Sequence, residues 1–172
     1  MGDFNTRVSL GTYQYFDGAN TSFAGSEVRY SGQKGYVGVG AYVASDDLKN
    51  AYGLFDLKGK LNYDSDGIFD QNLRVRTAFD SNIKTTQIRY SPLTVNVPVS
   101  ENVSIYSNTH YAGKYNYQSE KWAHSVGNFT GVSYDVTKKD NLSFELQRYN
   151  LQNIKDNNPN NWGVNVVYTH KF

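Results

Sequence analysis

Apolar and polar side chains alternate along most of this chain with a period of two residues. The clearest case is the segment Trp162–Phe172, where one face carries Trp162, Val164, Val166, Tyr168, His170 and Phe172. The other face carries Gly163, Asn165, Val167, Thr169 and Lys171, which are mostly small or polar. A period of two predicts a strand with two different environments. Aromatic residues at both ends of the apolar face, with aliphatic residues between them, favour a strand that crosses a bilayer.

The same alternation recurs between clusters of Gly, Asn, Asp and Ser, and predicts about ten strands joined by turns. The predicted strands are Phe4–Phe16, Phe23–Tyr30, Tyr36–Ala44, Tyr52–Tyr63, Phe69–Asp80, Ile83–Val97, Val103–Tyr117, Val126–Val136, Leu142–Leu151 and Trp162–Phe172. No capped helical periodicity occurs. Pro92 interrupts the sixth strand and shifts its apolar phase, which predicts a bulge or a strand end there. Eight and twelve strands therefore remain as alternatives.

The segment Trp162–Phe172 resembles the end of a bacterial outer-membrane β-barrel. In that family a terminal Phe, preceded by apolar or aromatic residues at alternate positions, is the signal read by the barrel-assembly machinery. The residues that match this signal are Val164, Val166, Tyr168 and Phe172, whereas His170 departs from it. The resemblance implies a single domain over residues 1–172, an all-β, antiparallel, up-and-down transmembrane barrel located in the outer membrane. It also implies periplasmic termini and contact with outer-membrane lipid and lipopolysaccharide.

The direction of the strands gives an independent check on this fold. If both termini are periplasmic, the even-numbered strands end on the periplasmic side, and each of those ends carries an aromatic residue. The residues concerned are Tyr30, Tyr63, Tyr90, Tyr134 and Phe172. Rings are enriched at membrane–water interfaces, so this regularity favours the barrel over the alternative, a soluble β-sandwich.

Composition narrows the class of protein. The 172 residues have a mean hydropathy of −0.63 and no apolar run of 18 residues, which excludes a transmembrane helix but not a barrel. The 15 Tyr residues suit two interfacial girdles. Cys is absent, and no metal-ligand spacing or nucleotide fingerprint is found, so no cofactor or metal is expected. A net charge of +1 gives no reason to expect nucleic acid as a partner. We interpret the start of the chain as that of a mature form whose export segment has been removed.

Candidate functional residues lie on the face that the alternation turns inward. Its basic residues are Arg7, Arg29, Lys58, Lys60, Arg74, Arg76, Arg89, Lys114 and Lys171, and His110 also points inward. Its acidic residues are Glu27, Asp56, Asp80, Asp135 and Glu145. The cations are densest on the fourth to sixth strands, where neighbouring strands bring them together. A basic lumen lowers the barrier for anions and raises it for cations.

A small, Tyr-rich barrel with a basic lumen is similar to the narrow, monomeric porins for acidic oligosaccharides, which usually have twelve strands. The resemblance lies in this overall character and in no particular motif. It implies a monomeric, non-enzymatic channel that passes small anionic or polar solutes. The alternative is a barrel closed by internal salt bridges, with an adhesion, interaction or structural role for its outer loops. These loops are Asp17–Ser22, Ser45–Asn50, Ser81–Asn82, Gln118–Ser125 and Gln152–Asn161. Trp122 is interpreted as a girdle residue in preference to a docking site. An outer-membrane hydrolase is the weakest interpretation, because no His constellation with a nucleophile is found.

Overall fold

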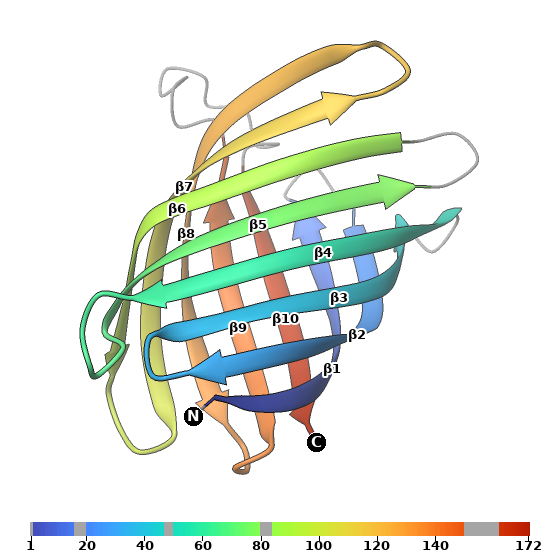
Figure 1. Cartoon of the computed structure of the whole chain (residues 1–172). Helices are drawn as coiled ribbons and strands as arrows, with labels where there is room; N and C mark the ends of the chain where they lie inside the picture. The colour runs from blue at the N-terminus through green and yellow to red at the C-terminus, as the bar shows by residue number, and fades with distance from the viewer. Residues whose placement is uncertain (1, 16–19, 47–49, 80–83, 150–161) are drawn as a thin grey trace.

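The protein is a closed barrel of ten antiparallel strands, as the alternation predicts. The computed structural model describes residues 2–15, 20–46, 50–79, 84–149 and 162–172. Each strand pairs with its neighbours in the sequence, which makes the topology up-and-down (Figure 1). In chain order the strands are β1 (Asp3–Tyr15), β2 (Asn20–Gly32), β3 (Gly35–Asp46), β4 (Asn50–Asn62), β5 (Phe69–Phe79), β6 (Lys84–Pro98), β7 (Val103–Asn116), β8 (Lys121–Asp135), β9 (Asp140–Arg148) and β10 (Trp162–Lys171).

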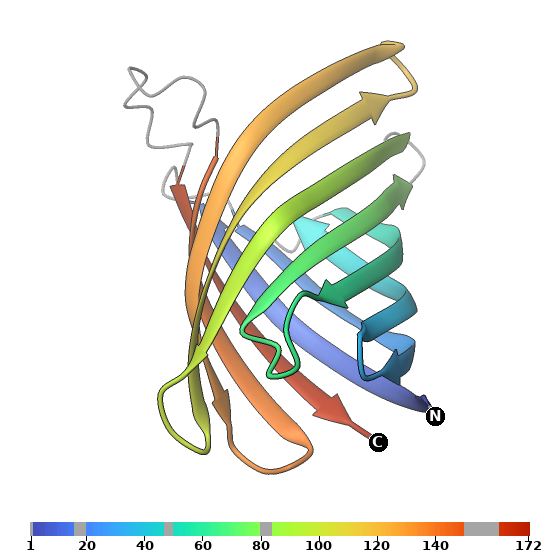
Figure 2. The ribbon, with the colours of Figure 1, turned by 60° about the vertical axis from the view of Figure 1, so that its left-hand side comes forward.

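The barrel closes where the first strand meets the last. β1 and β10 pair antiparallel from Arg7 opposite Lys171 to Tyr15 opposite Gly163, and the Phe172 amide donates to the Thr6 carbonyl oxygen at 2.9 Å. Closure removes the exposed strand edges that an open sheet would carry. Both termini lie at one end of the barrel, which we call the terminal end, and the opposite end is the far end (Figures 1 and 2).

Short turns connect the strands at the terminal end, and local chemistry explains them. Gly35 has φ +135°, and a Cβ there would lie 1.9 Å from the Lys60 carbonyl oxygen, so the β2–β3 turn requires glycine at this position. In the β4–β5 turn, the Asp64 carboxylate accepts hydrogen bonds from the Ile68 and Phe69 amides at 3.1 and 2.9 Å. These bonds lower the pKa of the Asp64 carboxyl group, because they stabilise its charged form.

The predicted irregularity at Pro92 is a β-bulge within a continuous β6. The register with β7 shifts between Tyr90 and Leu93, so two residues of β6 face one residue of β7. The Tyr63 hydroxyl donates to the Pro92 carbonyl oxygen at 2.9 Å on the outer surface. Because the bulge shifts the phase, Ser91 and Thr94 both lie inside and are buried. β6 runs on to Pro98, so Tyr90 does not lie at the strand end where the sequence interpretation put it.

The hairpin of β7 and β8 is longer than expected. The sequence predicts a loop over Gln118–Ser125, but β8 already begins at Lys121. The Asn116 side-chain oxygen accepts hydrogen bonds from the Gln118 and Ser119 amides at 2.9 and 3.1 Å, which closes the turn early. This hairpin extends beyond its neighbours at the far end (Figure 1). The other four predicted outer loops lie wholly or partly outside the described residues.

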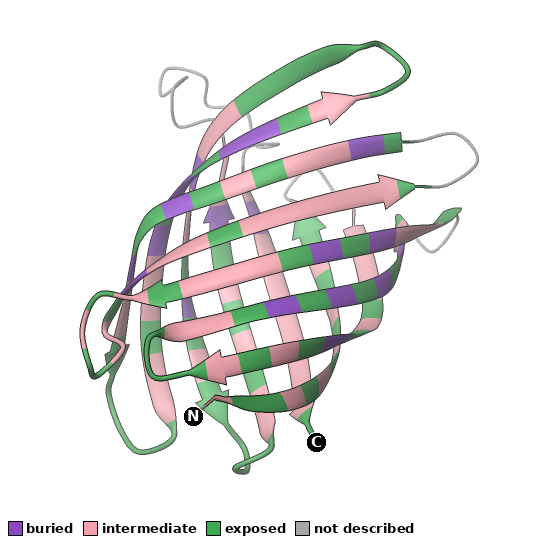
Figure 3. Ribbon diagram, in the orientation of Figure 1, coloured by how far each residue is buried: buried purple, intermediate pink, exposed green. Residues whose placement is uncertain are grey.

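The barrel exposes large apolar side chains and buries polar ones, the reverse of a water-soluble domain. Figure 3 shows how buried and exposed residues are distributed along the strands. Large apolar side chains on β1 to β9 are exposed on the outer surface. Among the described residues, the buried apolar side chains are Tyr42, Ala44, Leu54 and Ala112, and most buried side chains are polar. No helix in the described part of the chain is long and apolar enough to cross a membrane. A closed antiparallel barrel with an even number of strands, an apolar exterior and a polar interior is the architecture of an outer-membrane β-barrel.

Candidate functional site: the barrel interior

Three adjoining cavities occupy the barrel interior. A cavity of 480 Å³ lies toward the terminal end, where Lys60, Asp70 and Asn141 line it. A cavity of 370 Å³ lies toward the far end, where Asp46, Tyr52 and Lys114 line it. A central cavity of 310 Å³ shares lining residues with both. Arg74 and Arg89 are the two residues that line all three cavities, so their side chains stand where the two halves of the interior meet.

The strand register places these two arginines directly opposite each other. Arg74 of β5 is the Cα partner of Arg89 of β6, and Lys58 of β4 is the Cα partner of Arg74 on its other side. Residues opposite each other on neighbouring strands have Cβ atoms about 5 Å apart, and like charges in such pairs are destabilising. The sequence predicts the cluster on the fourth to sixth strands, and the register shows that three of its members form one row.

Most of the other cations near the middle of the barrel are held by carboxylates. Asp56 accepts two hydrogen bonds from Arg76, both at 2.6 Å, in a bidentate fork, and its side chain is 0% exposed. Lys58 lies 2.6 Å from Glu27 Oε2 and 3.7 Å from Asp56 Oδ2. Arg29 also pairs with Glu27. These contacts fix the positions of the three cations, and the two carboxylates offset two of their three positive charges.

Lys60 has a carboxylate partner that the sequence interpretation missed. Its Nζ atom lies 2.8 Å from Asp70 Oδ2, and Asp70 is buried. Asp70 has the same inward parity as Asn72 and Arg74, so the alternation on β5 already contained the signal. Asp46 is a second omission, because it was assigned to a solvated loop. It closes β3, accepts hydrogen bonds from the Thr21 and Tyr52 hydroxyls and lines the far cavity.

Arg74 and Arg89 contrast with these pairs. Within the described part of the chain, no carboxylate lies within 4.0 Å of either guanidinium group. Arg74 Nη2 makes one long contact of 3.4 Å with Gln87 Oε1. The Nε atoms of both arginines are buried and have no hydrogen-bond partner among the described residues. Buried donors are nearly always satisfied in folded proteins, so these two groups need an explanation.

Glu145 is the one acidic residue on the opposite wall of the central cavity that lacks an ion pair within the described residues. Three neutral groups donate hydrogen bonds to its carboxylate: the Tyr106 hydroxyl at 2.8 Å, Gln147 Nε2 at 2.8 Å and Asn165 Nδ2 at 2.9 Å. Glu145 and the two arginines line the same cavity from β9 and from β5–β6. The three neutral donors fix the position of this carboxylate, which lines the central cavity without forming an ion pair among the described residues.

The remaining predicted lining residues lie at different depths. Arg7 lines the central cavity, and its Nε atom donates to Asn5 Oδ1 at 3.2 Å. Lys114 lines the far cavity. His110 points inward but is only 1% exposed, because its ring packs against Phe129 with centroids 5.7 Å apart. His110 and Asp56 line none of the three cavities. Asp80 lies outside the described residues.

The histidines do not form a catalytic arrangement within the described residues. Both ring nitrogens of His110 are buried without a hydrogen-bond partner there, so no nucleophile stands beside this ring. His124 and His170 lie on the outer face, where their Nδ1 atoms contact the Tyr111 hydroxyl and Asp140 Oδ1 at 2.5 and 2.7 Å. The described residues also contain no group of His, Cys, Asp and Glu suited to a metal ion.

The residues of the predicted assembly signal share the outer face of the last strand. Val164, Val166 and Tyr168 pair with Leu146, Phe144 and Leu142 of β9, and Phe172 follows at the terminal end. Tyr168 and His170 both contact the Asp140 carboxylate, which accepts a hydrogen bond from the Tyr168 hydroxyl at 2.5 Å. The position of these side chains agrees with the pattern, and their role in assembly stays a prediction.

Comparisons with known proteins show a similarity of fold alone. No protein-family model and no curated protein matches the chain. The β domain of the Bordetella autotransporter BrkA is 12% identical, with 99% of each chain covered and a TM-score of 0.49. A KdgM porin solved in complex with disordered oligogalacturonate is 14% identical, with 99% of each chain covered and a TM-score of 0.45. The outer-membrane protease OmpT from Escherichia coli is 9% identical, with 99% of this chain and 93% of that chain covered and a TM-score of 0.39. Function must therefore be argued from the residues of this chain.

Proposed function

We propose that the protein is a narrow channel of the bacterial outer membrane that passes small anionic or polar solutes and prefers anions. The observation that carries the proposal is the position of Arg74 and Arg89. They line all three cavities of the lumen, and no carboxylate in the described part of the chain neutralises them. A cationic group at the junction of the two halves acts on every solute that crosses.

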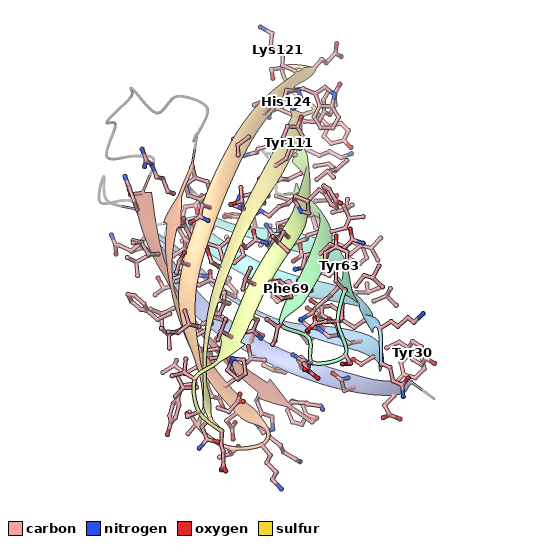
Figure 4. The ribbon with its side chains drawn as sticks, turned by 90° about the vertical axis from the view of Figure 1, so that its left-hand side faces the viewer. Tyr30, Tyr63, Phe69, Tyr111, Lys121 and His124 are labelled. Atoms are coloured by element: carbon pink, nitrogen blue, oxygen red, sulfur yellow. The ribbon has the colours of Figure 1, made fainter. Side chains whose placement is uncertain are left out.

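The outer surface supports the location in the membrane. Aliphatic side chains such as Val39, Leu57 and Leu73 are exposed there, where only lipid would cover them. Exposed rings lie toward the terminal end at Tyr30, Tyr63 and Phe69, and Tyr111 lies toward the far end (Figure 4). Aromatic rings favour the two interfaces of a bilayer, and aliphatic chains favour its hydrocarbon core. Outer-membrane lipid and lipopolysaccharide are therefore the proposed surroundings of a single, monomeric barrel domain.

Planar-bilayer recording in a potassium chloride gradient tests the proposal. We expect small unitary currents whose reversal potential has the sign expected when chloride is more permeant than potassium. The preference need not be strong, because about 1.4 kcal/mol of barrier height changes permeability tenfold. A reversal potential of the opposite sign would overturn the role assigned to the arginines. Silence in all recordings would instead indicate a closed barrel.

The assembly role of the last strand has its own test. We propose that the barrel-assembly machinery reads Phe172 together with Val164, Val166 and Tyr168. Deleting Phe172 should reduce the amount of protein in the outer membrane of cells much more than the refolding yield in detergent. The reason is that Phe172 is exposed and contributes one backbone hydrogen bond to barrel closure. Equal amounts in cells with and without Phe172 would contradict the role.

An interaction role is the second candidate, and the β7–β8 hairpin favours it. Tyr111, Lys121 and His124 lie toward the tip of this hairpin (Figure 4). The rings of Trp122 and His124 stack with centroids 5.9 Å apart, and Trp122 is 51% exposed. An exposed aromatic stack beside a cation can dock a partner as well as anchor at the interface. If the hairpin is the functional part, Trp122→Ala should abolish adhesion to a host-cell surface and leave the channel currents unchanged.

A further inference from the structure

Arg74 and Arg89 have many hydrogen-bond donors that no described residue uses. Each guanidinium group carries five N–H donors and accepts none. Within the described residues, the pair makes one hydrogen bond, the 3.4 Å contact from Arg74 Nη2 to Gln87 Oε1. Both Nε atoms are buried without a partner among the described residues. An acceptor that entered the central cavity would therefore find several donors already desolvated and in place.

The nearby Arg76 shows that this barrel can neutralise a central arginine. Arg76 points inward two residues after Arg74 on the same strand, and Asp56 opposite it supplies a bidentate carboxylate. Within the described residues, no carboxylate forms such an ion pair with Arg74 or Arg89, although these two side chains of like charge are direct neighbours. Two opposed guanidinium groups are stable when an anion between them satisfies both forks.

The charge of the central cavity calls for an anion with more than one negative charge. Six cationic side chains line this cavity: Arg7, Arg29, Lys58, Arg74, Arg76 and Arg89. The acidic residues that line it are Glu27 and Glu145, and Glu27 is already shared by Arg29 and Lys58. Asp56 behind Arg76 adds one further negative charge. The surplus of positive charge is therefore concentrated at Arg74, Arg89 and Arg7.

The central cavity is large enough for a small ligand. Its 310 Å³ is about ten times the ~30 Å³ that one water molecule occupies in the liquid. A tetrahedral oxyanion with part of its hydration shell fits such a volume. The two donors of a planar guanidinium fork match the spacing of two oxygens in a phosphate-like group or a carboxylate. Chloride is a single atom and cannot offer two such acceptors.

We propose that Arg74 and Arg89 form a discrete binding site for a small doubly charged oxyanion of the phosphate or sulfate type. This inference rests on the proposed function in one respect, which is that the anion reaches the site through the lumen. It goes beyond a diffuse preference for anions, because a discrete site saturates and distinguishes oxyanions from chloride at equal ionic strength. Arg74 and Arg89 bind the oxyanion, and Gln87 orients Arg74.

Thermal unfolding of the barrel refolded in detergent tests the site without requiring current. Inorganic phosphate is titrated against potassium chloride of equal ionic strength, and a second titration uses sodium sulfate. We expect the melting temperature to rise and saturate with either oxyanion, since a ligand that binds only the folded state stabilises it. Arg89→Gln and Arg74→Gln should each raise the half-saturating concentration about tenfold, the cost of about 1.4 kcal/mol in binding.

Two further variants make the result specific. Lys114→Gln removes the same charge from the far cavity and should leave the half-saturating concentration unchanged, whereas a general charge effect would change it as much as Arg89→Gln does. Arg89→Lys keeps the charge but loses the fork, and should bind with intermediate strength. No saturable shift, or one that the arginine variants leave intact, would overturn the site. If the currents are anion-selective but the melting temperature does not saturate with oxyanion, the proposed channel stands and the binding site is rejected. If the melting temperature saturates but no current is seen, the binding site stands and the channel is rejected.

Discussion

The interior of this barrel contains two groups of cations that differ in their partners. Arg29, Lys58 and Arg76 are held by Glu27 and Asp56, with oxygen–nitrogen distances of 2.6 Å for Lys58–Glu27 and Arg76–Asp56. Arg74 and Arg89 lie in the same region, on neighbouring strands, and have no carboxylate partner among the described residues. The first group is fixed in position, and its two carboxylates offset two of its three positive charges. The second group is left to act on whatever enters the lumen.

This difference shows that a count of lumen charges is a poor measure of selectivity. A cation in a bidentate pair presents little net field, because the carboxylate oxygens lie within hydrogen-bond distance of its donors. A cation without such a partner presents its full field across a narrow space lined by low-dielectric protein. Mutation of the paired cations should therefore change mainly the stability of the barrel, whereas mutation of the unpaired cations should change mainly its ion selectivity.

The largest expected effect is on selectivity. Replacing both Arg74 and Arg89 by Glu should shift the ratio of chloride to potassium permeability by at least about tenfold toward potassium, since ~1.4 kcal/mol of barrier suffices for that change. Reversal potentials in a salt gradient measure it. The matched control is Lys114→Glu with Lys171→Glu, which changes the net charge equally outside the central cavity. An equal shift in the control would show that position within the lumen is irrelevant.

The next effect is on stability. Asp56→Asn should lower the free energy of unfolding by about 2 kcal/mol, because it leaves Arg76 without its carboxylate partner, whereas Lys58 keeps Glu27. This is less than for a fully buried pair, since the Arg76 side chain is 28% exposed. Arg74→Gln should cost nothing or stabilise slightly, because it relieves the repulsion from Arg89. Urea unfolding in detergent compares the two variants, and a larger loss for Arg74→Gln would contradict the assignment of partners.

A smaller effect is expected from the carboxylate on the opposite wall. Glu145→Gln should increase the preference for anions two- to threefold, about 0.5 kcal/mol, because it removes a negative charge that faces the arginines. The neutral donors around it limit the structural consequences, since a glutamine oxygen can still accept from Tyr106. The measurement is the reversal potential, with Asp46→Asn in the far cavity as the control. An unchanged or weaker preference in Glu145→Gln would show that this carboxylate does not oppose the arginine pair.

The smallest effect is that of salt on the unmodified channel. The screening length falls from about 10 Å at 0.1 M to about 3 Å at 1 M. The ratio of chloride to potassium permeability should therefore decline as both solutions are made more concentrated at a fixed gradient. A ratio that does not depend on salt would indicate that pore size, and not the fixed charge of Arg74 and Arg89, sets the preference.

The alternation of the sequence was sufficient to predict the fold, but Asp70 was missing from the inward acidic residues. The period of two is local, and in a barrel each strand has one face toward lipid and one toward the interior. It could not predict which cations have partners, because that depends on register between strands. The register around Arg89 depends on the bulge at Pro92, and Asp70 reaches Lys60 diagonally on the neighbouring strand, where Asn72 is the residue directly opposite Lys60. The early closure of the β7–β8 turn by Asn116 was likewise hidden in a short polar segment.

The most direct test of the central claim compares two neutralised pairs. Arg74→Gln with Arg89→Gln removes the cations without carboxylate partners, and Asp56→Asn with Arg76→Gln removes one neutral ion pair at the same depth. Reversal potentials are recorded for both variants and the unmodified protein in the same chloride gradient. The first variant should lose its anion preference, and the second should keep it. Loss of preference in the second variant alone, or in neither, would contradict the claim that the unpaired arginines set the selectivity.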